Sequence, residues 1–288
     1  MKFNSNLNII KDNFYNQALL FTKSHYENFP VISFFIPKEL QKHIAVIYWF
    51  ARTADDIADE GSLSEEIRLK QLEEFEDNFT NALNSKPRND FESALVNTIR
   101  GKNLTQSLFY DLLKAFKQDV IKKRYENFEE VIEYCKHSAN PVGRLILELF
   151  DIRNEDAFRL SDKICTALQL TNFYQDLQID FRKGRIYLPE DELQKFNVSK
   201  KSFELKENSL NLQQLLRHNI SRTEQMFKEG RGLLKHLKGR LRFEISWTIL
   251  GGEEILKKIK KIEYNTINIR PELSKRDYLF LAVKSLFI

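Results

Sequence analysis

Glycine and proline are scarce in this chain. Nine glycines and six prolines among 288 residues make about 5%, against an average of about 12% for the pair. This scarcity argues against β-sandwiches, propellers, collagen-like chains and linker-rich chains. The two cysteines, Cys135 and Cys165, do not stand at CxxC spacing, so neither a disulfide framework nor a zinc site is indicated. We therefore expect a protein of the reducing cytoplasm.

Long apolar runs and an excess of one charge are also missing. The longest stretch without a charged residue, 164–175, has 12 residues, fewer than the ~18 that a membrane span needs. The first 20 residues lack the apolar core of a signal peptide. A net charge of +4 is a weak basis for a nucleic-acid partner, and no GxGxxG motif follows a strand. We expect a soluble protein without a nucleic-acid partner, and we leave a peripheral membrane contact open.

What the chain has instead is a helical period over most of its length. With 42% hydrophobic and 30% charged residues it can also bury a sizeable core. Apolar residues recur at steps of three and four in the segments 7–23, 38–60, 64–83, 91–100, 105–117, 128–150, 154–181, 209–237 and 243–262. We find no strand series, no dividing linker and no internal repeat. The sequence thus predicts a single all-α domain over residues 1–288.

Two of these segments, 38–60 and 154–181, are apolar for most of their length and then end in acidic residues. Helices that are apolar on most sides belong in the middle of a bundle. Carboxylates at the ends of such helices place negative charge at the mouth of an apolar interior.

The first acidic motif lies in the sequence YWFARTADDIADE, residues 48–60. On a helix Asp55 and Asp59 share one face, and Tyr48 and Arg52 continue that stripe toward the N-terminus. Like charges at this spacing destabilise a helix, so a cation is their natural complement. A solvated acidic helix end is the alternative interpretation, and the flanking aromatic residues argue against it.

The second acidic motif lies in the sequence NFYQDLQID, residues 172–180. Successive steps of four rotate by only about 40° on a helix, so Asn172, Asp176 and Asp180 share a face. One amide oxygen and two carboxylates are hard oxygen ligands of the kind that Mg²⁺ uses when it also binds substrate phosphates. Two such rows on two buried helices are more specific than either alone.

Electrostatics indicate what must neutralise these rows. The two motifs together carry five acidic residues, Asp55, Asp56, Asp59, Asp176 and Asp180. Any pair of them brought to about 4 Å would repel by about 4 kcal/mol at an effective dielectric constant of 20. Two or three Mg²⁺ ions would neutralise the cluster and leave positions for a diphosphate, with Arg52, Arg185 and Lys275 to bind its remaining oxygens. Beside an apolar, aromatic-lined cavity, this combination predicts a prenyl diphosphate substrate.

At these residues the chain resembles the squalene and phytoene synthase family of all-α prenyltransferases, over nearly its whole length. The segments that carry the resemblance are HYENFPV at 25–31, ARTADDIADEG at 51–61, HSANPVGRL at 137–145, NFYQD at 172–176, GRIYLP at 184–189 and RPELSK at 270–275. They look most like the hydroxysqualene synthases of bacterial hopanoid pathways. The resemblance implies an isoprenoid-synthase-type helical bundle around a central apolar cavity, with both acidic motifs at its mouth.

The resemblance also implies a reaction and its residues. The branch that this chain resembles takes presqualene diphosphate to hydroxysqualene by ionisation, rearrangement and capture of water. By motif position, the residues that would hold Mg²⁺ are Asp55, Asp59, Asn172, Asp176 and Asp180. Arg52 and His25 would bind substrate, and Tyr48 and Tyr187 fall where the family places active-site tyrosines, whose ring faces can stabilise a carbocation. We expect water to enter near Asn172, Gln175 and Tyr187.

Several positions depart from the phytoene synthase pattern. Glu27-Asn28-Phe29 stands where many members have Lys-Ser-Phe, which removes a basic residue from a phosphate subsite. NFYQD replaces the usual Asn-Ile-Leu-Arg-Asp, and Ile179 stands where an acid usually precedes the last aspartate. Fewer charges suit a site that handles one diphosphate rather than two. This supports the second half-reaction, and because the sequence offers no recognisable site for a hydride carrier, we expect no NADPH requirement.

Two alternatives stay open at this point. One is complete squalene or phytoene synthesis from two prenyl diphosphates, and the other is a non-catalytic scaffold of the same fold, against which the intact acidic motifs argue. The basic run Lys257, Lys258, Lys260 and Lys261 is interpreted first as a solvated helix face, with a contact to anionic lipid as its alternative. Other enzymes of the same pathway are the macromolecular partners that the resemblance suggests.

Overall fold

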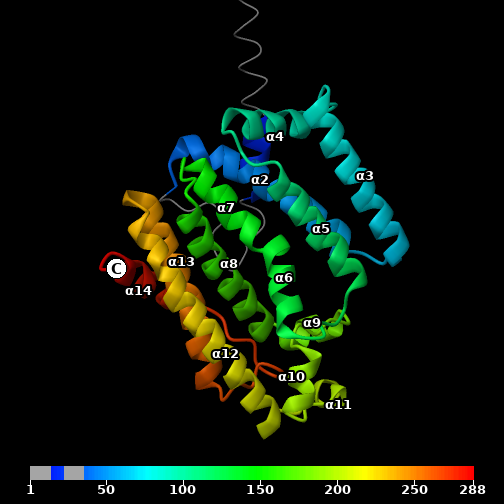
Figure 1. Cartoon of the computed structure of the whole chain (residues 1–288), viewed down its shortest axis with the longest axis vertical. Helices are drawn as coiled ribbons and strands as arrows, with labels where there is room; N and C mark the ends of the chain where they lie inside the picture. Colours follow the sequence, from blue (N-terminus) through cyan, green and yellow to red (C-terminus); the bar gives the residue numbers. More distant parts are fainter. Residues whose placement is uncertain (1–13, 23–35) are drawn as a thin grey trace, which may run out of the picture. The chain divides into compact units, whose positions relative to one another are not determined.

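The computed structural model describes residues 14–22 and 36–288 (Figure 1). Regular secondary structure in these two ranges is entirely helical, which confirms the all-α prediction. The chain divides into two compact units, Met1–Ile121 with Arg144–Arg153, and Lys122–Gly143 with Asn154–Ile288. The single domain expected from the sequence stays a prediction. His25, one of the predicted substrate-binding residues, lies outside the described residues.

The first unit is built on the helix that carries the first acidic motif. Besides helical residues 14–22 and the second part of α7 (Asn140–Leu149), it contains α2 (Lys38–Asp59), α3 (Glu65–Asn84), α4 (Asp90–Gly101) and α5 (Ser107–Ile121). Its core centres on the fully buried Phe50 of α2, whose ring centroid lies 5.2, 5.0 and 5.3 Å from those of Phe75, Phe79 and Phe109. Aromatic pairs at this spacing add to the free energy of burial. The helix end that carries the motif is thereby fixed on α3 and α5.

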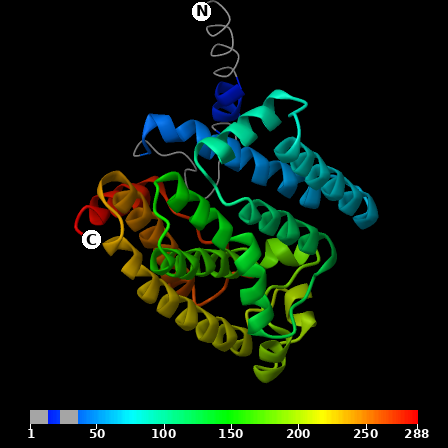
Figure 2. The same cartoon turned by 45° about the horizontal axis from the view of Figure 1, so that its top comes forward.

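The second unit surrounds α8 (Glu155–Gln175), the helix that leads into the second acidic motif (Figure 2). Its other helices are α6 (Phe128–Ser138), the first part of α7, α9 (Leu177–Arg182), α10 (Glu190–Lys195), α11 (Lys200–Glu204), α12 (Leu210–Gly230), the short 3-10 helix η1 (Arg231–Lys235), α13 (Gly239–Lys261) and α14 (Lys275–Ser285). Helices α6, α12 and α13 pack directly on α8. The predicted position of this helix at the middle of its bundle is confirmed within the unit.

Two glycines permit this close packing. A Cβ on Gly230 of α12 would lie 2.6 Å from Cγ1 of Ile164, and a Cβ on Gly252 of α13 would lie 2.8 Å from Cδ2 of Leu168. Both distances are shorter than a Cβ contact in proteins, so the neighbouring side chain or the helix would have to move. Glycine at these two positions therefore lets α12 and α13 approach the central helix.

The helices differ from the sequence expectation in several places: α5 ends at Ile121 rather than at 117, and α10, α11 and α14 lie outside the segments predicted to be helical. The segment 128–150 is divided at Ala139 into α6 and α7, and the segment 154–181 is divided at Asp176 into α8 and α9. Segment 209–237 ends as η1, and α13 begins four residues before the predicted position 243. Apolar periodicity continues across a single non-helical residue, so it does not reveal such breaks.

None of the helices in the described ranges combines the length and apolar character needed to cross a membrane.

Candidate functional site

The first acidic motif occupies the last turns of α2. Arg52 is bound to its own helix's acids: its Nε lies 2.7 Å from Oδ1 of Asp56, its Nη1 3.6 Å from Oδ2 of Asp55 and its Nη2 2.9 Å from Oε1 of Glu60. Asp55 and Asp59 are half-buried, one turn apart, as the spacing predicts. The structure thus brings together Arg52, Asp55 and Asp59, with Asp56 and Glu60 as further partners of the arginine.

The electrostatic environment of Asp55 shows an excess of negative charge. Partial burial raises the pKa of this carboxyl to about 7; the charges of Asp59, Asp119 and Asp56 act in the same direction, and that of Arg52 opposes them. Asp119 is a buried residue of α5 that the sequence reasoning missed. Its signal in the sequence is an acid near the carboxyl end of the amphipathic helical stretch 108–121, which also contains Asp111. A cation would relieve this excess charge.

The chain turn after the motif is held by Arg68 of α3. Its guanidinium donates to the carbonyl oxygens of Ile57, Gly61 and Leu63 at 3.0, 2.7 and 3.2 Å. Gly61 has φ +79°, a conformation that glycine adopts without strain. Arg68 is buried and fixes the carboxyl end of α2. It therefore positions the acidic motif without belonging to it.

The second acidic motif spans the junction of α8 and α9. Asp176 is the junction residue, with φ −101° and ψ 20°. The bonds from its N–H to Asn172 O and from the Asp180 N–H to Asp176 O persist, both at 2.9 Å. The helical row of Asn172, Asp176 and Asp180 therefore survives the break, as the spacing predicts.

Arg270 is the main partner of the second motif, and the sequence reasoning did not select it. Its Nε lies 2.6 Å from Oδ1 of Asp176 and its Nη2 3.3 Å from Oδ2, while Nδ2 of Asn172 donates to Oδ2 at 2.9 Å. The Nη1 of Arg270 is 2.6 Å from Oε1 of Glu272. Arg270 is the first residue of the RPELSK segment, 94 positions after Asp176. The sequence did point to this segment, but only Lys275 was predicted from it as a diphosphate-binding residue.

Three other residues of this unit were predicted to bind substrate, and they differ in burial and in their hydrogen-bond partners. Gln175 is buried and its Nε2 donates to Pro271 O at 2.6 Å, so it holds the loop that carries Arg270. Arg185 is buried just after α9, and its N–H donates to Asp180 O at 2.9 Å. Lys275 is an exposed residue at the start of α14. The residue of this segment that contacts the motif is Arg270.

The two predicted tyrosines lie in aromatic surroundings, one in each unit. Tyr48 on α2 has its ring centroid 6.3 Å from that of Phe21. Tyr187 is buried and stacks on Phe173 of α8 at 3.7 Å with an interplanar angle of 5°. The rings of Tyr125 and Tyr134 lie 5.6 and 5.7 Å from Tyr187. One face of Tyr187 is therefore covered by Phe173, and the remaining rings form an aromatic cluster that the sequence reasoning did not identify.

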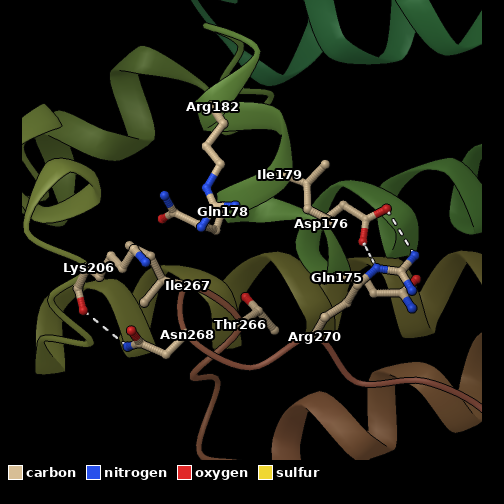
Figure 3. Close-up of a pocket in the computed structure, with 10 residues that line it drawn as sticks. All are labelled: Gln175, Asp176, Gln178, Ile179, Arg182, Lys206, Thr266, Ile267, Asn268 and Arg270. Carbon is tan, nitrogen blue, oxygen red and sulfur yellow. Dashed lines mark hydrogen bonds and ion pairs between the residues drawn. The ribbon is translucent and has the colours of Figure 1, made fainter.

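A pocket of about 170 Å³ borders Asp176 in the second unit (Figure 3). Its lining includes Gln175, Gln178 and Arg182 of α8 and α9, and Thr266 and Arg270 of the segment between α13 and α14. Oε1 of Gln178 and Oγ1 of Thr266 are buried atoms without a hydrogen-bond partner. The row from Gln175 to Arg182 is a different helical face from the row of Asn172, Asp176 and Asp180. Arg270 contacts both the pocket and the acidic motif.

The donors of both motifs fit magnesium by their chemistry. Each is a carboxylate or amide oxygen, which are the ligands that Mg²⁺ prefers, and the raised pKa of Asp55 indicates charge that a cation would offset. Among the described residues of either unit, no three side chains of His, Cys, Asp or Glu gather into a group that could hold a metal ion. Each motif alone therefore offers part of a coordination shell, and substrate or water oxygens would have to supply the rest.

Comparisons with known proteins agree with these features of the chain. A family model described as squalene/phytoene synthase matches residues 22–277. A hydroxysqualene synthase of Sinorhizobium fredii is 36% identical over 241 residues, which cover 81% of this chain and 80% of that protein. A phytoene synthase of Solanum lycopersicum is 26% identical over 243 residues, 82% of this chain and 59% of that protein.

Solved structures show the same relationship. Squalene synthase HpnC from Alicyclobacillus acidocaldarius superposes with a TM-score of 0.84 at 33% identity, over 89% of this chain and 97% of that one. A dehydrosqualene synthase solved with a ligand gives a TM-score of 0.86 at 21% identity, over 96% of both chains, which shows a shared fold. The isoprenoid-synthase-type bundle expected from the sequence is confirmed.

Proposed function

The chain belongs to the squalene/phytoene synthase family and is a prenyl diphosphate-processing enzyme, and we propose that it converts presqualene diphosphate to hydroxysqualene. The choice of the hydroxysqualene synthase branch rests on sequence identity. Three hydroxysqualene synthases match at 36, 35 and 35%, whereas the plant phytoene synthases match at 26 to 27%. The matches are to proteins named as synthases, which supports an enzyme rather than a scaffold.

The proposed reaction balances without an external reductant. The C–O bond to the diphosphate breaks, and the leaving group takes the electron pair. The cyclopropylcarbinyl cation that remains rearranges, the oxygen of a water molecule bonds to it, and one proton is lost. Presqualene diphosphate and water thus give hydroxysqualene and diphosphate. Reduction to squalene would require a hydride donor such as NADPH, which this reaction does not need.

The acidic motifs are the proposed magnesium-binding residues. Asp55 and Asp59 in one unit, and Asn172, Asp176 and Asp180 in the other, would hold the metal, in agreement with the general dependence of the family on divalent metals. Bound magnesium supplies charge neutralisation for a departing diphosphate. Metal binding at Asp176 would require its oxygens to be shared between the metal and Arg270, which bonds to both of them.

The arginines are the proposed diphosphate-binding groups. Arg52 and Arg270 each stand beside a motif and are already paired with its carboxylates. A guanidinium has five donors, so it can keep one carboxylate bond and donate to a phosphate oxygen with the others. Arg185, buried beside Asp180, is the third such residue. These side chains would orient the leaving group and stabilise its charge as the C–O bond breaks.

The aromatic cluster around Tyr187 is the proposed lining for the carbocation. Tyr125, Tyr134, Phe173 and Tyr187 present apolar rings that exclude bulk water, and an uncovered ring face attracts a cation. Because Phe173 covers one face of Tyr187, the rings of Tyr125 and Tyr134 take part of this role. Exclusion of bulk water limits premature capture of the cation, so that rearrangement precedes addition of water.

The experiment is an incubation of the purified protein with presqualene diphosphate in ¹⁸O-labelled water, without NADPH, with products identified by mass spectrometry. We expect an alcohol that carries the label. Farnesyl diphosphate is the parallel substrate, and Asp176→Ala is the control for non-enzymatic hydrolysis. Formation of squalene only with NADPH, or of phytoene from a C20 diphosphate, would assign the chain to another branch of the family.

A further inference from the structure

Helix α14 and the residues after it present a large apolar face to solvent. The side chains of Leu279, Phe280, Val283, Leu286 and Phe287 are 70, 66, 51, 68 and 84% exposed. Helical spacing places Leu279, Phe280 and Val283 on one side of α14, and Leu286 and Phe287 follow directly after its last residue, Ser285. Single exposed apolar residues are ordinary, but five large ones within nine positions form a patch that marks an interaction surface.

The opposite side of α14 accounts for its attachment to the protein. Leu281 and Ser285 are buried, and the ring of Tyr278 lies 6.1 Å from that of Trp247 on α13. The helix begins with a capping box between Ser274 and Asp277. Its inner face and its start are therefore fixed, so the outward direction of the apolar side chains follows from packing.

The exposed charged residues of α14 are positive. Lys275, Arg276 and Lys284 are exposed at the two ends of α14. The acid within the helix, Asp277, is engaged by Lys258 at 2.8 Å and by the hydroxyl of Ser274 at 2.7 Å. An apolar face with basic residues at its margins is the pattern of helices that lie in a membrane interface.

We propose that this face, from Leu279 to Phe287, is a docking surface for a membrane with anionic lipids. Two copies of the chain packed through it would bring like charges together, whereas anionic headgroups attract the same lysines and arginine. The 11 residues of α14 extend over about 16 Å, too short to cross a bilayer, so the helix would lie in the interface. The inference rests on the proposed function in one respect: a long prenyl substrate partitions into lipid.

A short link joins α14 to the arginine that contacts the second acidic motif. Arg270, which bonds to Asp176, is separated from the first residue of α14 by four residues. Within that link, the carbonyl of Pro271 accepts from Gln175 of α8. Docking through α14 would thus hold the carboxyl end of α8 near the lipid in which prenyl chains dissolve.

The structure disfavours the basic run of α13 as the lipid contact. Lys257, Lys258 and Lys260 lie 3.3, 2.8 and 2.5 Å from carboxylate oxygens of Glu254, Asp277 and Glu224. Three of the four lysines considered from the sequence are therefore already paired with acids. The positive charge available to lipid lies on α14 instead.

The test is sedimentation of the full chain with vesicles of phosphatidylcholine, with and without phosphatidylglycerol. We expect binding to the anionic vesicles, and a loss of about tenfold or more in affinity for the double variant Phe280→Ser with Phe287→Ser, because a phenylalanine side chain inserted in lipid contributes at least a tenfold factor. Arg276→Glu with Lys284→Glu should remove the preference for anionic lipid. The matched control is Leu205→Ser with Leu210→Ser, which alters side chains that are 63 and 74% exposed elsewhere in the unit.

Three outcomes would overturn the proposal. They are no binding of the unmodified protein to either vesicle, equal binding of the phenylalanine variant, and equal loss in the leucine control. Light scattering tests whether a second copy of the chain occupies the face instead. If the unmodified protein is a dimer that does not bind vesicles, and the phenylalanine variant is a monomer, lipid docking would also be refuted. Vesicle binding uses no substrate, so its failure is distinguishable from failure of the proposed reaction. Activity on detergent-dispersed substrate should be unchanged in the phenylalanine variant and should decrease only with substrate in vesicles.

Discussion

The two aspartates that the sequence presents as equivalent, Asp55 and Asp176, should have opposite effects on stability. Asp55 stands among other acids, which together with partial burial raise its pKa to about 7 from an ordinary 3.8. A shift of about three pKa units corresponds to about 4 kcal/mol. The side chain is 41% exposed, so solvent screening reduces this to about 1–2 kcal/mol. Asp55→Asn should therefore stabilise the metal-free protein near pH 8.

The sign of the pH dependence follows from the same shift. Because the pKa of Asp55 is higher in the folded protein than in the unfolded chain, the folded protein binds the proton more tightly. The stability that this tighter proton binding gives the folded protein is fully present below pH 4 and is lost as the pH rises through about 7. The advantage of Asp55→Asn should accordingly be absent at pH 4 and complete at pH 8.

Asp176 is the contrasting case, because it is paired. Its side chain is 15% exposed and is bonded through both oxygens to Arg270. Asp176→Asn removes the carboxylate that Arg270 contacts through two nitrogens, leaves the exposed Glu272 as its remaining acid partner and should cost about 1–3 kcal/mol. Asp77→Asn, at an exposed position of α3, is the matched control and should stay within about 0.5 kcal/mol of the unmodified protein.

The assay is thermal unfolding of the three variants in chelator from pH 4 to pH 8, repeated with Mg²⁺. For a chain of this size each kcal/mol shifts the melting temperature by about 2–4 °C. Mg²⁺ should stabilise the unmodified protein, since a ligand that binds only the folded state raises its stability. It should therefore reduce the stability advantage of Asp55→Asn over the unmodified protein. A destabilised Asp55→Asn protein at pH 8, or a difference that does not change with pH, would refute the reasoning.

Three further predictions concern activity and packing. Chelation of divalent metal, Asp55→Ala or Asp176→Ala should each abolish turnover while circular dichroism shows a folded protein, and full activity under any of these conditions would contradict the magnesium assignment. Arg52→Ala should weaken diphosphate binding by about tenfold or more, read as a raised KM or as a weaker Kd for inorganic diphosphate, because a charge-assisted bond contributes about 1.5–3 kcal/mol; unchanged constants would show that Arg52 only pairs with the acids. Gly252→Ala should lower the free energy of unfolding by about 1–3 kcal/mol because its Cβ would lie 2.6 Å from an aromatic ring, whereas Gly101→Ala, with open space around it, should be neutral or stabilising in chemical denaturation.

The sequence by itself determined the features that depend on neighbouring residues. Helical periodicity and the scarcity of glycine and proline identified an all-α fold, and the structure confirms it. Spacing alone placed Asp55 beside Asp59, and Asn172 beside Asp176, because residues four apart on a helix are necessarily neighbours. The family followed from the same short motifs. Such features are local, so they can be read without knowing how the helices pack.

Tertiary structure alone decided which distant groups act on these motifs. Arg270 reaches Asp176 across 94 positions, and Asp119 of α5 adds its charge to Asp55 of α2. The division of one predicted helix at Asp176 is equally invisible to periodicity, because the apolar pattern runs on through the junction. The exposed face of α14 has the same origin: its residues are apolar on several sides, and only packing against α13 determines which side faces solvent. Contacts between segments remote in sequence are set by how helices pack, and a single sequence does not record that packing.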